Sequence, residues 1–271
     1  MRITHRDRVL LSHISEYGML TTKQINKKIF GGIANTTVLR RLRSLEEAKL
    51  IKRLIGLESQ ETLWIILEKA LNEIEGGNFY KRYWNKNLLE HDFKLLSLRL
   101  LLEGEGIAKS WEPEHKIRYL IFQKYNEVEA KKKIIPDGLM ITETQFKRVS
   151  VAIELELTLK NKERLKEVLN RYKDKKDLDV LWYVCGSKIV ANGIINAWNS
   201  IKLGSTLRLK VSLLNDVLNN PTAHWPAQWV SNSQVGQKSV TGDLSTQNSN
   251  RIVISLPPPQ IASSTDSLSL T

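Results

Sequence analysis

Hydrophobic positions in the first seventy residues follow helical spacing and then strand spacing. Apolar side chains recur every three or four residues in three segments, followed by two short runs rich in β-branched residues. The spacing predicts three helices and two strands, over residues 6–17, 22–30, 38–48, 50–56 and 62–66. Thr21 or Thr22 caps the second helix, and Gly31-Gly32 makes the turn before the third. We expect residues 1–75 to form a domain of their own.

A second set of elements begins near residue 84. The pattern predicts a helix at 84–102, a strand at 107–117 broken by Pro113 and continued at 119–122, strands at 134–141 and 149–157, a helix at 161–174, a strand at 179–185, a helix at 190–201 and a strand at 207–213. Residues 179–185 are apolar on both faces, as expected for a covered central strand, whereas residues 207–213 alternate as a half-exposed strand. This order predicts an α/β domain over 84–230, with a mixed sheet between helices.

The last forty residues differ in composition from the rest. From residue 231 the chain is rich in Ser, Gln, Asn, Thr and Pro, which cannot bury enough apolar area to offset chain entropy. We therefore expect a disordered, low-complexity tail over 231–271. The apolar island at 251–256 suits an added strand or a partner, but the composition favours a solvated tail.

Composition favours a nucleic-acid partner. The 271 residues contain 41 Lys and Arg against 29 Asp and Glu, a net charge of +12. Such an excess favours a polyanionic surface, DNA or RNA before membrane. No apolar run approaches the roughly 20 residues that span a bilayer, and the first residues do not resemble a signal segment. The single cysteine, Cys185, excludes an intramolecular disulfide and favours a core position. We expect a cytoplasmic protein without membrane contact.

Three helices followed by a hairpin resemble a winged helix-turn-helix. Residues 35–51 look like its recognition helix running into the wing, a helix that would lie in the major groove of double-stranded DNA. The basic residues of this segment are the predicted DNA contacts, namely Arg40, Arg41, Arg43, Lys52 and Arg53. The same fold also serves protein–protein contacts, so protein binding is the alternative.

Carboxylates cluster in the two predicted strands at 134–141 and 149–157. Glu154 and Glu156 are two apart in an apolar strand and therefore project to the same side, and Asp137 stands at the mouth of the neighbouring strand. Buried carboxylates are costly unless they meet a cation or a donor. Three carboxylates are the oxygen ligands that hard cations prefer, so the pattern predicts a site for Mg²⁺ or Mn²⁺.

This arrangement resembles the active site of the PD-(D/E)xK nuclease superfamily, whose fold is restriction-endonuclease-like. Pro136-Asp137 matches the first motif and residues 154–156 match the second. The lysine of that family belongs two residues after the second acid, where this chain has Glu156. Lys160 or Lys162, at the start of the following helix, would then supply the positive charge. The resemblance implies catalysis by Asp137, Glu154, Glu156 and Lys160.

The combination of a winged helix and a nuclease-like domain is similar to the replication-relaxation group of plasmid proteins, which includes MobC-type mobilisation relaxases. The resemblance covers roughly residues 5–185 and adds residues 90–92 and Tyr172 to the motifs above. His91 would be an auxiliary residue bordering the metal site. Tyr172 is either a nucleophile that attaches to DNA or, as favoured, a ring packed against the sheet. The basic residues on the helix at 161–174 would follow the phosphate backbone, namely Lys166, Arg171 and Lys173.

The sequence leads to two hypotheses. The first is a metal-dependent, site-specific DNA endonuclease of relaxase type, nicking plasmid or mobile-element DNA at an origin-type site. The second is a DNA-binding regulator of plasmid replication or mobilisation with an inactive nuclease-like domain, which the missing family lysine favours. Contacts with other mobilisation or replication proteins, and a homodimer acting on inverted repeats, stay open.

Overall fold

The protein is an α+β chain that divides into two compact units. The computed structural model describes residues 2–55, 61–74, 88–143, 147–173, 175–201, 207–225 and 253–254. Unit 1 spans Met1–Met140 and unit 2 spans Ile141–Thr271. The predicted domain boundary between residues 75 and 84 lies outside the described residues.

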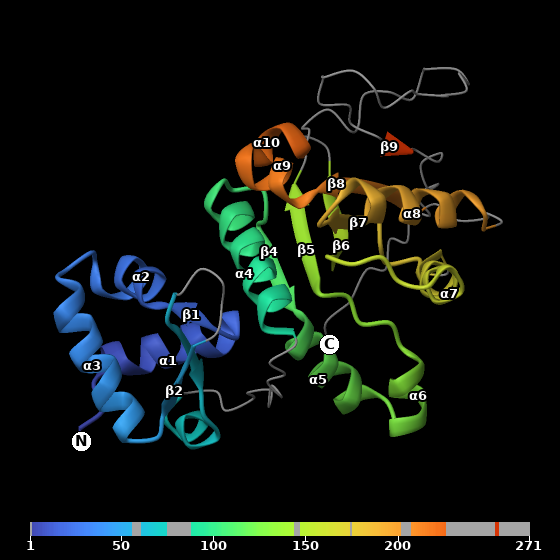
Figure 1. Ribbon diagram of the computed structural model, residues 1–271. Helices are drawn as coiled ribbons and strands as arrows, with labels where there is room; N and C mark the ends of the chain where they lie inside the picture. The colour runs from blue at the N-terminus through green and yellow to red at the C-terminus, as the bar shows by residue number, and fades with distance from the viewer. Residues whose placement is uncertain are drawn as a thin grey trace, which may run out of the picture. The chain divides into compact units, whose positions relative to one another are not determined.

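Unit 1 begins with short helices interleaved with a small sheet (Figure 1). Its first elements are α1 (His5–Tyr17), β1 (Leu20–Thr21), α2 (Thr22–Ile25), the π-helical turn η1 (Asn26–Phe30), α3 (Asn35–Glu47), β2 (Ile51–Leu54), β3 (Leu63–Ile66) and the 3-10 helix η2 (Glu68–Glu73). The three helices and two strands predicted from the spacing are confirmed. The additional strand β1 pairs with β3, giving an antiparallel order β1-β3-β2. Strand β1 is only two residues long, so it is too short to be predicted from alternating hydrophobic and polar positions.

Side-chain caps fix where the first two helices begin. Thr4 accepts a hydrogen bond from the backbone N–H of Asp7, whose carboxylate accepts from the Thr4 N–H in return. Thr21 and Gln24 form the same reciprocal box at the start of α2. Such caps satisfy backbone donors that a helix start leaves open, at about 1 kcal/mol each.

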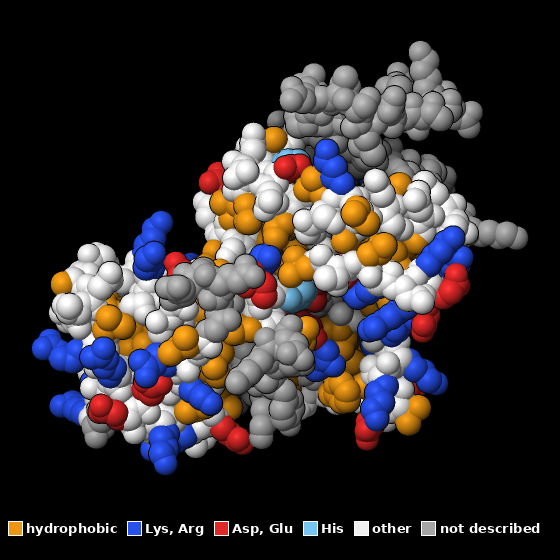
Figure 2. All heavy atoms as spheres, in the orientation of Figure 1, with side chains coloured by type: hydrophobic (Ala, Val, Ile, Leu, Met, Phe, Trp, Pro, Cys, Tyr) orange, Lys and Arg blue, Asp and Glu red, His pale blue; other side chains and the backbone are white. Residues whose placement is uncertain are grey.

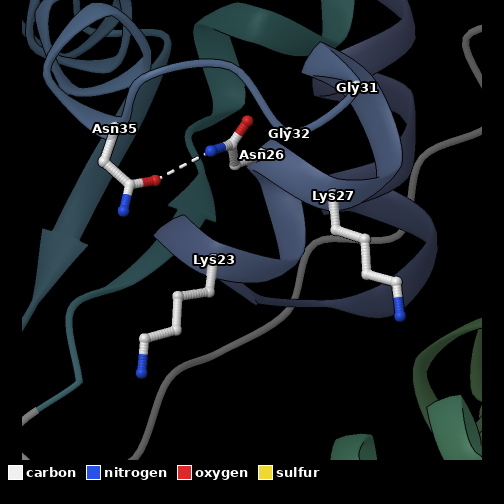
Figure 3. Close-up of a pocket in the computed structure, with 6 residues that line it drawn as sticks. All are labelled: Lys23, Asn26, Lys27, Gly31, Gly32 and Asn35. Carbon is white, nitrogen blue, oxygen red and sulfur yellow. Dashed lines mark hydrogen bonds between the residues drawn. The ribbon is translucent and has the colours of Figure 1, made fainter.

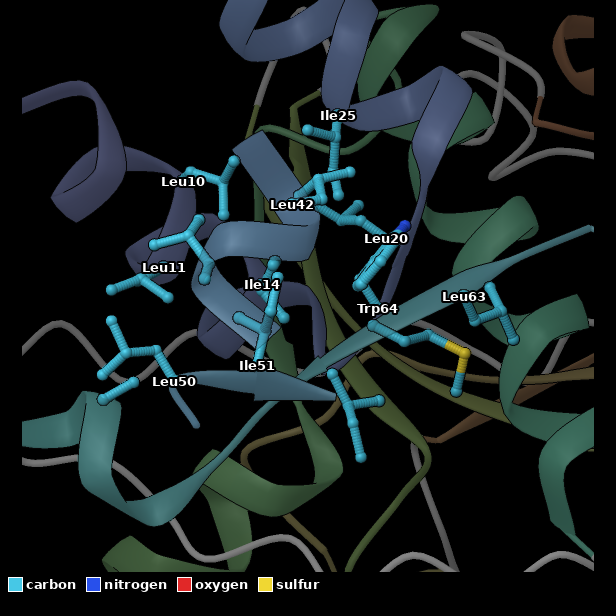
Figure 4. Packing of buried hydrophobic residues seen from close by; sticks show 14 of the residues in the cluster. Leu10, Leu11, Ile14, Leu20, Ile25, Leu42, Leu50, Ile51, Leu63 and Trp64 are labelled. Atoms are coloured by element: carbon cyan, nitrogen blue, oxygen red, sulfur yellow. The ribbon is translucent and has the colours of Figure 1, made fainter. Parts of the chain in front are cut away.

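The core of the N-terminal elements combines apolar faces of α1 and α3 with the small sheet. Figure 4 shows these side chains converging on Trp64, which is 1 % exposed and donates its indole N–H to the Thr22 hydroxyl at 2.9 Å. Members of the cluster that the figure labels are Leu10, Leu11, Ile14, Leu20, Ile25, Leu42, Leu50, Ile51 and Leu63. Because α3 uses Leu42 and its helical neighbours for this core, its opposite face is left for solvent.

Helix α4 (Leu89–Gly104) is tied to α1 by a buried arginine. Arg99 is 6 % exposed and donates to the Glu16 carboxylate at 2.7 Å and to Glu103 at 2.8 Å. Its guanidinium also lies 4.3 Å from the ring centroid of Tyr17, whose hydroxyl donates to Glu103 at 2.7 Å. Breaking this network would leave a buried charge without partners, so α4 is fixed to the N-terminal helices.

The predicted strand over 107–117 and 119–122 is largely wrong. Only β4 (Ser110–Pro113) is extended, and α5 (Glu114–Lys124) and α6 (Glu127–Lys132) follow. Pro113 has φ −75° and ψ 156° and stands just before the helix, where its missing N–H costs nothing. The ion pair between Arg118 and Glu114, four residues apart, then supports α5. The apolar run at 119–122 thus belongs to a helix.

Unit 2 is built on parallel strands with helical crossovers (Figure 1). Strand β5 (Gly138–Glu143) enters it at residue 141, and β6 (Arg148–Glu156), α7 (Lys162–Lys173), β7 (Val180–Cys185), α8 (Lys188–Asn199), β8 (Arg208–Leu213), α9 (Leu214–Asn219) and α10 (Pro221–His224) follow. The sheet order in this unit is β5-β6-β7-β8-β9, where β9 is Val253–Ile254. Strands β6, β7 and β8 pair in parallel, and β9 pairs antiparallel to β8, so the sheet is mixed.

Burial in unit 2 agrees with the sequence at β7 and differs at β8. Every residue of β7 is buried, as predicted for a covered strand, and Cys185 is a core residue. In β8 Lys210 is only 3 % exposed, although the alternation predicted a half-exposed strand. The ammonium of Lys210 lies 4.9 Å and 5.2 Å from the ring centroids of Trp182 and Trp225. Cation–π contacts with the two tryptophans therefore stabilise the buried ammonium of Lys210, which the alternating pattern predicted to be exposed.

Two residues of the C-terminal tail are ordered against the sheet. Val253 and Ile254 pair with Lys210 and Leu209 of β8. At these two positions the predicted alternative of an added strand is observed. The remainder of the predicted tail lies outside the described residues. In the described part of the chain no helix combines the length and apolar character needed to cross a bilayer.

Candidate functional site

Helix α3 presents a polar face with two arginines to solvent. Val38, Leu42 and Leu45 are buried at helical spacing, and Arg40 and Arg43 on the opposite side are exposed. Asn35, Thr36 and Thr37 in the first turn are also exposed, and no side chain caps this helix start. The early residues of α3, together with Arg40 and Arg43, are therefore accessible to an external partner.

Arg41, a third predicted DNA contact, is engaged inside the protein. Its guanidinium donates to both carboxylate oxygens of Asp7 and, at 3.1 Å, to the backbone oxygen of Arg2. Asp7 is 1 % exposed. Burial raises the pKa of Asp7, but hydrogen bonds from Arg41 and Thr4 outweigh it and hold the pKa below its usual value. Arg41 thus joins α3 to α1, and of the three arginines predicted to contact DNA only Arg40 and Arg43 are exposed.

A hollow with a volume of about 510 Å³ lies beside the start of α3 (Figure 3). Its lining residues come from α2, η1 and the following turn, namely Lys23, Asn26, Lys27, Gly31, Gly32 and Asn35. Asn26 donates its side-chain N–H groups to the Ile33 oxygen at 2.7 Å and to Asn35 Oδ1 at 2.8 Å, which fixes the loop. Gly31 and Gly32 have φ values of 69° and 79°, which favour glycine. The two lysines add positive charge beside α3.

Strand β2 adds further exposed charge. Lys52 and Arg53, both predicted DNA contacts, are exposed, and the Arg53 backbone N–H donates to Glu46 of α3 at 2.9 Å. Figure 2 shows Lys and Arg side chains spread over the surface around α1 to α3. Lys23 and Lys27 were not among the predicted DNA contacts, although three lysines within six residues ahead of a Gly-Gly turn indicate a local positive charge.

The two glutamates of β6 are placed as the alternation predicted. Glu154 and Glu156 pair in register with Tyr183 and Cys185 of β7 and so project to one face of the sheet. The hydroxyl of Tyr172 on α7 donates to Glu154 Oε1, which shows that α7 covers this face. Tyr172 is fully buried, so the favoured prediction of a packed ring is confirmed.

Glu156 lies at the carboxyl end of β6 and is paired with Lys160. The Lys160 ammonium contacts Glu156 Oε2, and Glu156 is 6 % exposed. Lys160 precedes α7 in the connecting loop, so it reaches back over the strand end as expected. Burial, together with the charge of Glu156, raises the pKa of the Cys185 thiol to about 12. The position two residues after Glu154 is thus acidic, and its charge is matched by a lysine four residues later.

Asp137 belongs to unit 1 and contacts His91 of α4. His91 Nε2 lies 3.3 Å from Asp137 Oδ2, and His91 Nδ1 lies 3.2 Å from Asp92 Oδ1. Burial lowers the pKa of His91, but the two carboxylates outweigh it and raise the pKa to about 10. His91 is therefore a cation at neutral pH. His91 thus lies beside Asp137, and its auxiliary role at a metal site stays a prediction.

The face of β6 that carries Glu154 and Glu156 is the part of the structure where a metal ion was predicted. Among the described residues no group of three or more His, Cys, Asp or Glu side chains is arranged to hold a metal ion. Mg²⁺, however, is often held by only one or two carboxylates, with water and substrate phosphate completing its shell. Glu154 and Glu156 are two carboxylates on one face of the strand, engaged by Tyr172 and Lys160 respectively, and their role as metal ligands stays a prediction. The assignment of Asp137 as a further ligand stays a prediction from the sequence.

The basic residues of α7 are placed less uniformly than predicted. Lys166 is paired with Glu163 at 3.3 Å, Arg171 is exposed and Lys173 is half-buried. An exposed ion pair of this kind is weak, so Lys166 remains available to a stronger anion.

Comparison with known proteins gives no relative for this chain: no protein-family model, curated protein or solved structure matches it.

Proposed function

We propose that the chain is a DNA-binding protein whose N-terminal helices act as a winged helix-turn-helix. The observation that carries the proposal is the division of α3 into a buried apolar face and an exposed face with Arg40 and Arg43. Arginine in the major groove donates two hydrogen bonds to guanine, and exposed cations also contact phosphate. The flanking charges of Lys23, Lys27 and Lys52 extend this basic surface.

The test is binding of a DNA duplex by the full chain, measured by fluorescence anisotropy at several salt concentrations. Arg40→Ala combined with Arg43→Ala should weaken binding, by about 1–3 kcal/mol for each arginine that reads a guanine. The matched control is Arg148→Ala, which removes an exposed charge (79 % exposed side chain) from β6. Equal affinities for the double variant and the wild type would assign α3 to protein contacts instead.

The second candidate function is metal-dependent hydrolysis of a phosphodiester bond in the bound DNA. It is favoured by the pairing of Glu156 with Lys160, because a lysine at the end of a strand that carries two glutamates supplies the kinds of charge found in the nuclease motif that the sequence resembles. A bound Mg²⁺ or Mn²⁺ would lower the pKa of a water molecule and neutralise charge on the scissile phosphate. Glu154 and Glu156 would hold the ion, Tyr172 would orient Glu154, and Lys160 would position the nucleophile.

Supercoiled plasmid carrying a DNA site selected by the protein tests this activity. Incubation with Mn²⁺ should give relaxed circles, and EDTA should prevent it. Glu154→Gln combined with Glu156→Gln should abolish relaxation and leave duplex affinity unchanged, whereas Glu163→Gln, at a side chain of α7 that is 78 % exposed, serves as the control. Tight binding without relaxation in either metal would favour the alternative, a DNA-binding regulator of plasmid replication or mobilisation.

A further inference from the structure

The helices α5 and α6 of unit 1 leave an apolar surface open. Of their residues only His115 and Ala130 are buried. Large apolar side chains are exposed instead, with Leu120 at 49 %, Phe122 at 44 % and Val128 at 66 %. An amphipathic helix normally buries its apolar side chains against a neighbour, so this surface is expected to take a partner.

Positive charge surrounds that apolar surface. Residues 114–133 contain six Lys and Arg against three Glu, a net charge of +3. At least three of the cations are in local ion pairs, Lys116 with Glu112, Arg118 with Glu114 and Lys131 with Glu127. Figure 2 shows hydrophobic and basic side chains next to each other over α5 and α6. The partner is therefore expected to combine apolar surface with negative charge.

Aromatic rings and ammonium groups meet at the end of α5. The ammonium groups of Lys133 and Lys124 lie 4.2 Å and 5.5 Å from the ring centroid of Tyr125. Phe122 is exposed one helical turn earlier, whereas the ring of Tyr125 is half-buried. Exposed aromatic rings interleaved with lysines are how proteins bind single-stranded nucleic acid, because bases stack on the rings while the lysines follow the phosphates.

We propose that the α5–α6 surface binds single-stranded DNA or RNA through Phe122, Lys124, Tyr125 and Lys133. A duplex is a poorer occupant, since its base faces are already stacked and unavailable to Phe122. An anionic membrane is also a poorer occupant, because Glu127 and Glu129 flank exposed Val128 and would be repelled by lipid headgroups. The surface is separate in sequence from α3 and goes beyond the duplex recognition proposed above.

The experiment is fluorescence anisotropy of a labelled oligo-dT strand with the full chain. Phe122→Ala and Phe122→Leu should each weaken binding by about tenfold, since both remove the ring, whereas Phe122→Trp should retain it. Ile189→Ala, which trims another exposed apolar side chain (71 % exposed) on α8, is the control and should bind normally. Lys124→Ala combined with Lys133→Ala should reduce the slope of log affinity against log salt by about one unit or more. Circular dichroism confirms that each variant is folded.

Three results would overturn the proposal. The first is unchanged oligo-dT affinity in Phe122→Ala. The second is wild-type affinity in Phe122→Leu, which would show that the surface needs apolar area and not a ring. The third is binding to phosphatidylserine vesicles that is lost with Phe122 while oligo-dT binding persists. The Arg40→Ala, Arg43→Ala variant separates this proposal from the first, because it should lose duplex affinity and keep oligo-dT affinity.

Discussion

The N-terminal helices and the parallel sheet of unit 2 handle charge in opposite ways. Helix α3 exposes Arg40 and Arg43 to solvent. Strand β6, in contrast, holds Glu154 beside the Tyr172 hydroxyl and Glu156 beside the Lys160 ammonium. Exposed cations act over a distance on a polyanion and are weakened by salt. The carboxylates of half-buried Glu154 and buried Glu156 are paired with protein groups, so they interact only with a ligand that comes into direct contact with them. The first arrangement suits recognition of DNA and the second suits local chemistry.

The largest effect is expected on the rate of plasmid relaxation, when each of two neighbouring lysines of unit 2 is replaced. Lys160 contacts Glu156, whereas Lys162 is exposed at the start of α7. Lys160→Ala should reduce Mn²⁺-dependent relaxation by about 100-fold, the usual cost of removing one group that stabilises charge in a transition state, and Lys162→Ala should have little effect. Rates of plasmid relaxation measure both. Equal loss in the two variants would remove Lys160 from the proposed site.

The next effect concerns stability of the N-terminal helices. Asp7→Asn leaves Arg41 without its ion pair and weakens the cap of α1, so the free energy of unfolding should fall by about 1–3 kcal/mol. The pKa of Asp7 is lowered on folding, so its contribution is present above the unfolded value of about 3.8 and is lost as pH falls through the lower folded pKa. Urea unfolding at pH 7 and pH 3 measures the difference. A deficit that is as large at pH 3 as at pH 7 would contradict the assignment.

A pH-dependent effect on stability is expected from His91 in unit 1. Its pKa rises to about 10 in the folded protein, so its contribution to stability is complete below about pH 6.5 and declines as pH rises towards 10. The wild type should therefore lose stability between pH 7 and pH 10, and His91→Gln should flatten that decline. Thermal unfolding across this range measures it. NMR titration of the His91 ring with a midpoint near 6.5 would contradict the ion pairs with Asp92 and Asp137.

Spacing predicted the regular elements well where one face of each is buried. The three N-terminal helices, the strands at β6 and β7, and the position of Glu154 and Glu156 all follow from periods of 3.6 and 2. The run at 119–122 was misread because four consecutive apolar residues carry no period that separates a strand from a helix. Lys210 was misplaced because alternation cannot anticipate two tryptophans that shelter an ammonium group.

Contacts between residues far apart in the chain could not be predicted from the sequence. Arg40, Arg41 and Arg43 are equivalent in the sequence, and only the fold shows that Arg41 meets Asp7, 34 positions earlier. The contact between His91 and Asp137 is likewise non-local, at 3.3 Å between residues of different elements. Such partners depend on how helices pack, which local patterns do not specify.

The central claim, that α3 reads DNA, is tested most directly by selection from a random pool of duplexes. The wild-type chain should enrich a defined sequence over successive rounds, because arginines in the major groove distinguish guanine from other bases. The variant with Arg40→Ala and Arg43→Ala, in which Arg41 still pairs with Asp7, should retain weak binding and enrich no sequence. Enrichment of the same sequence by both proteins would contradict the account, as would an absence of enrichment by the wild type.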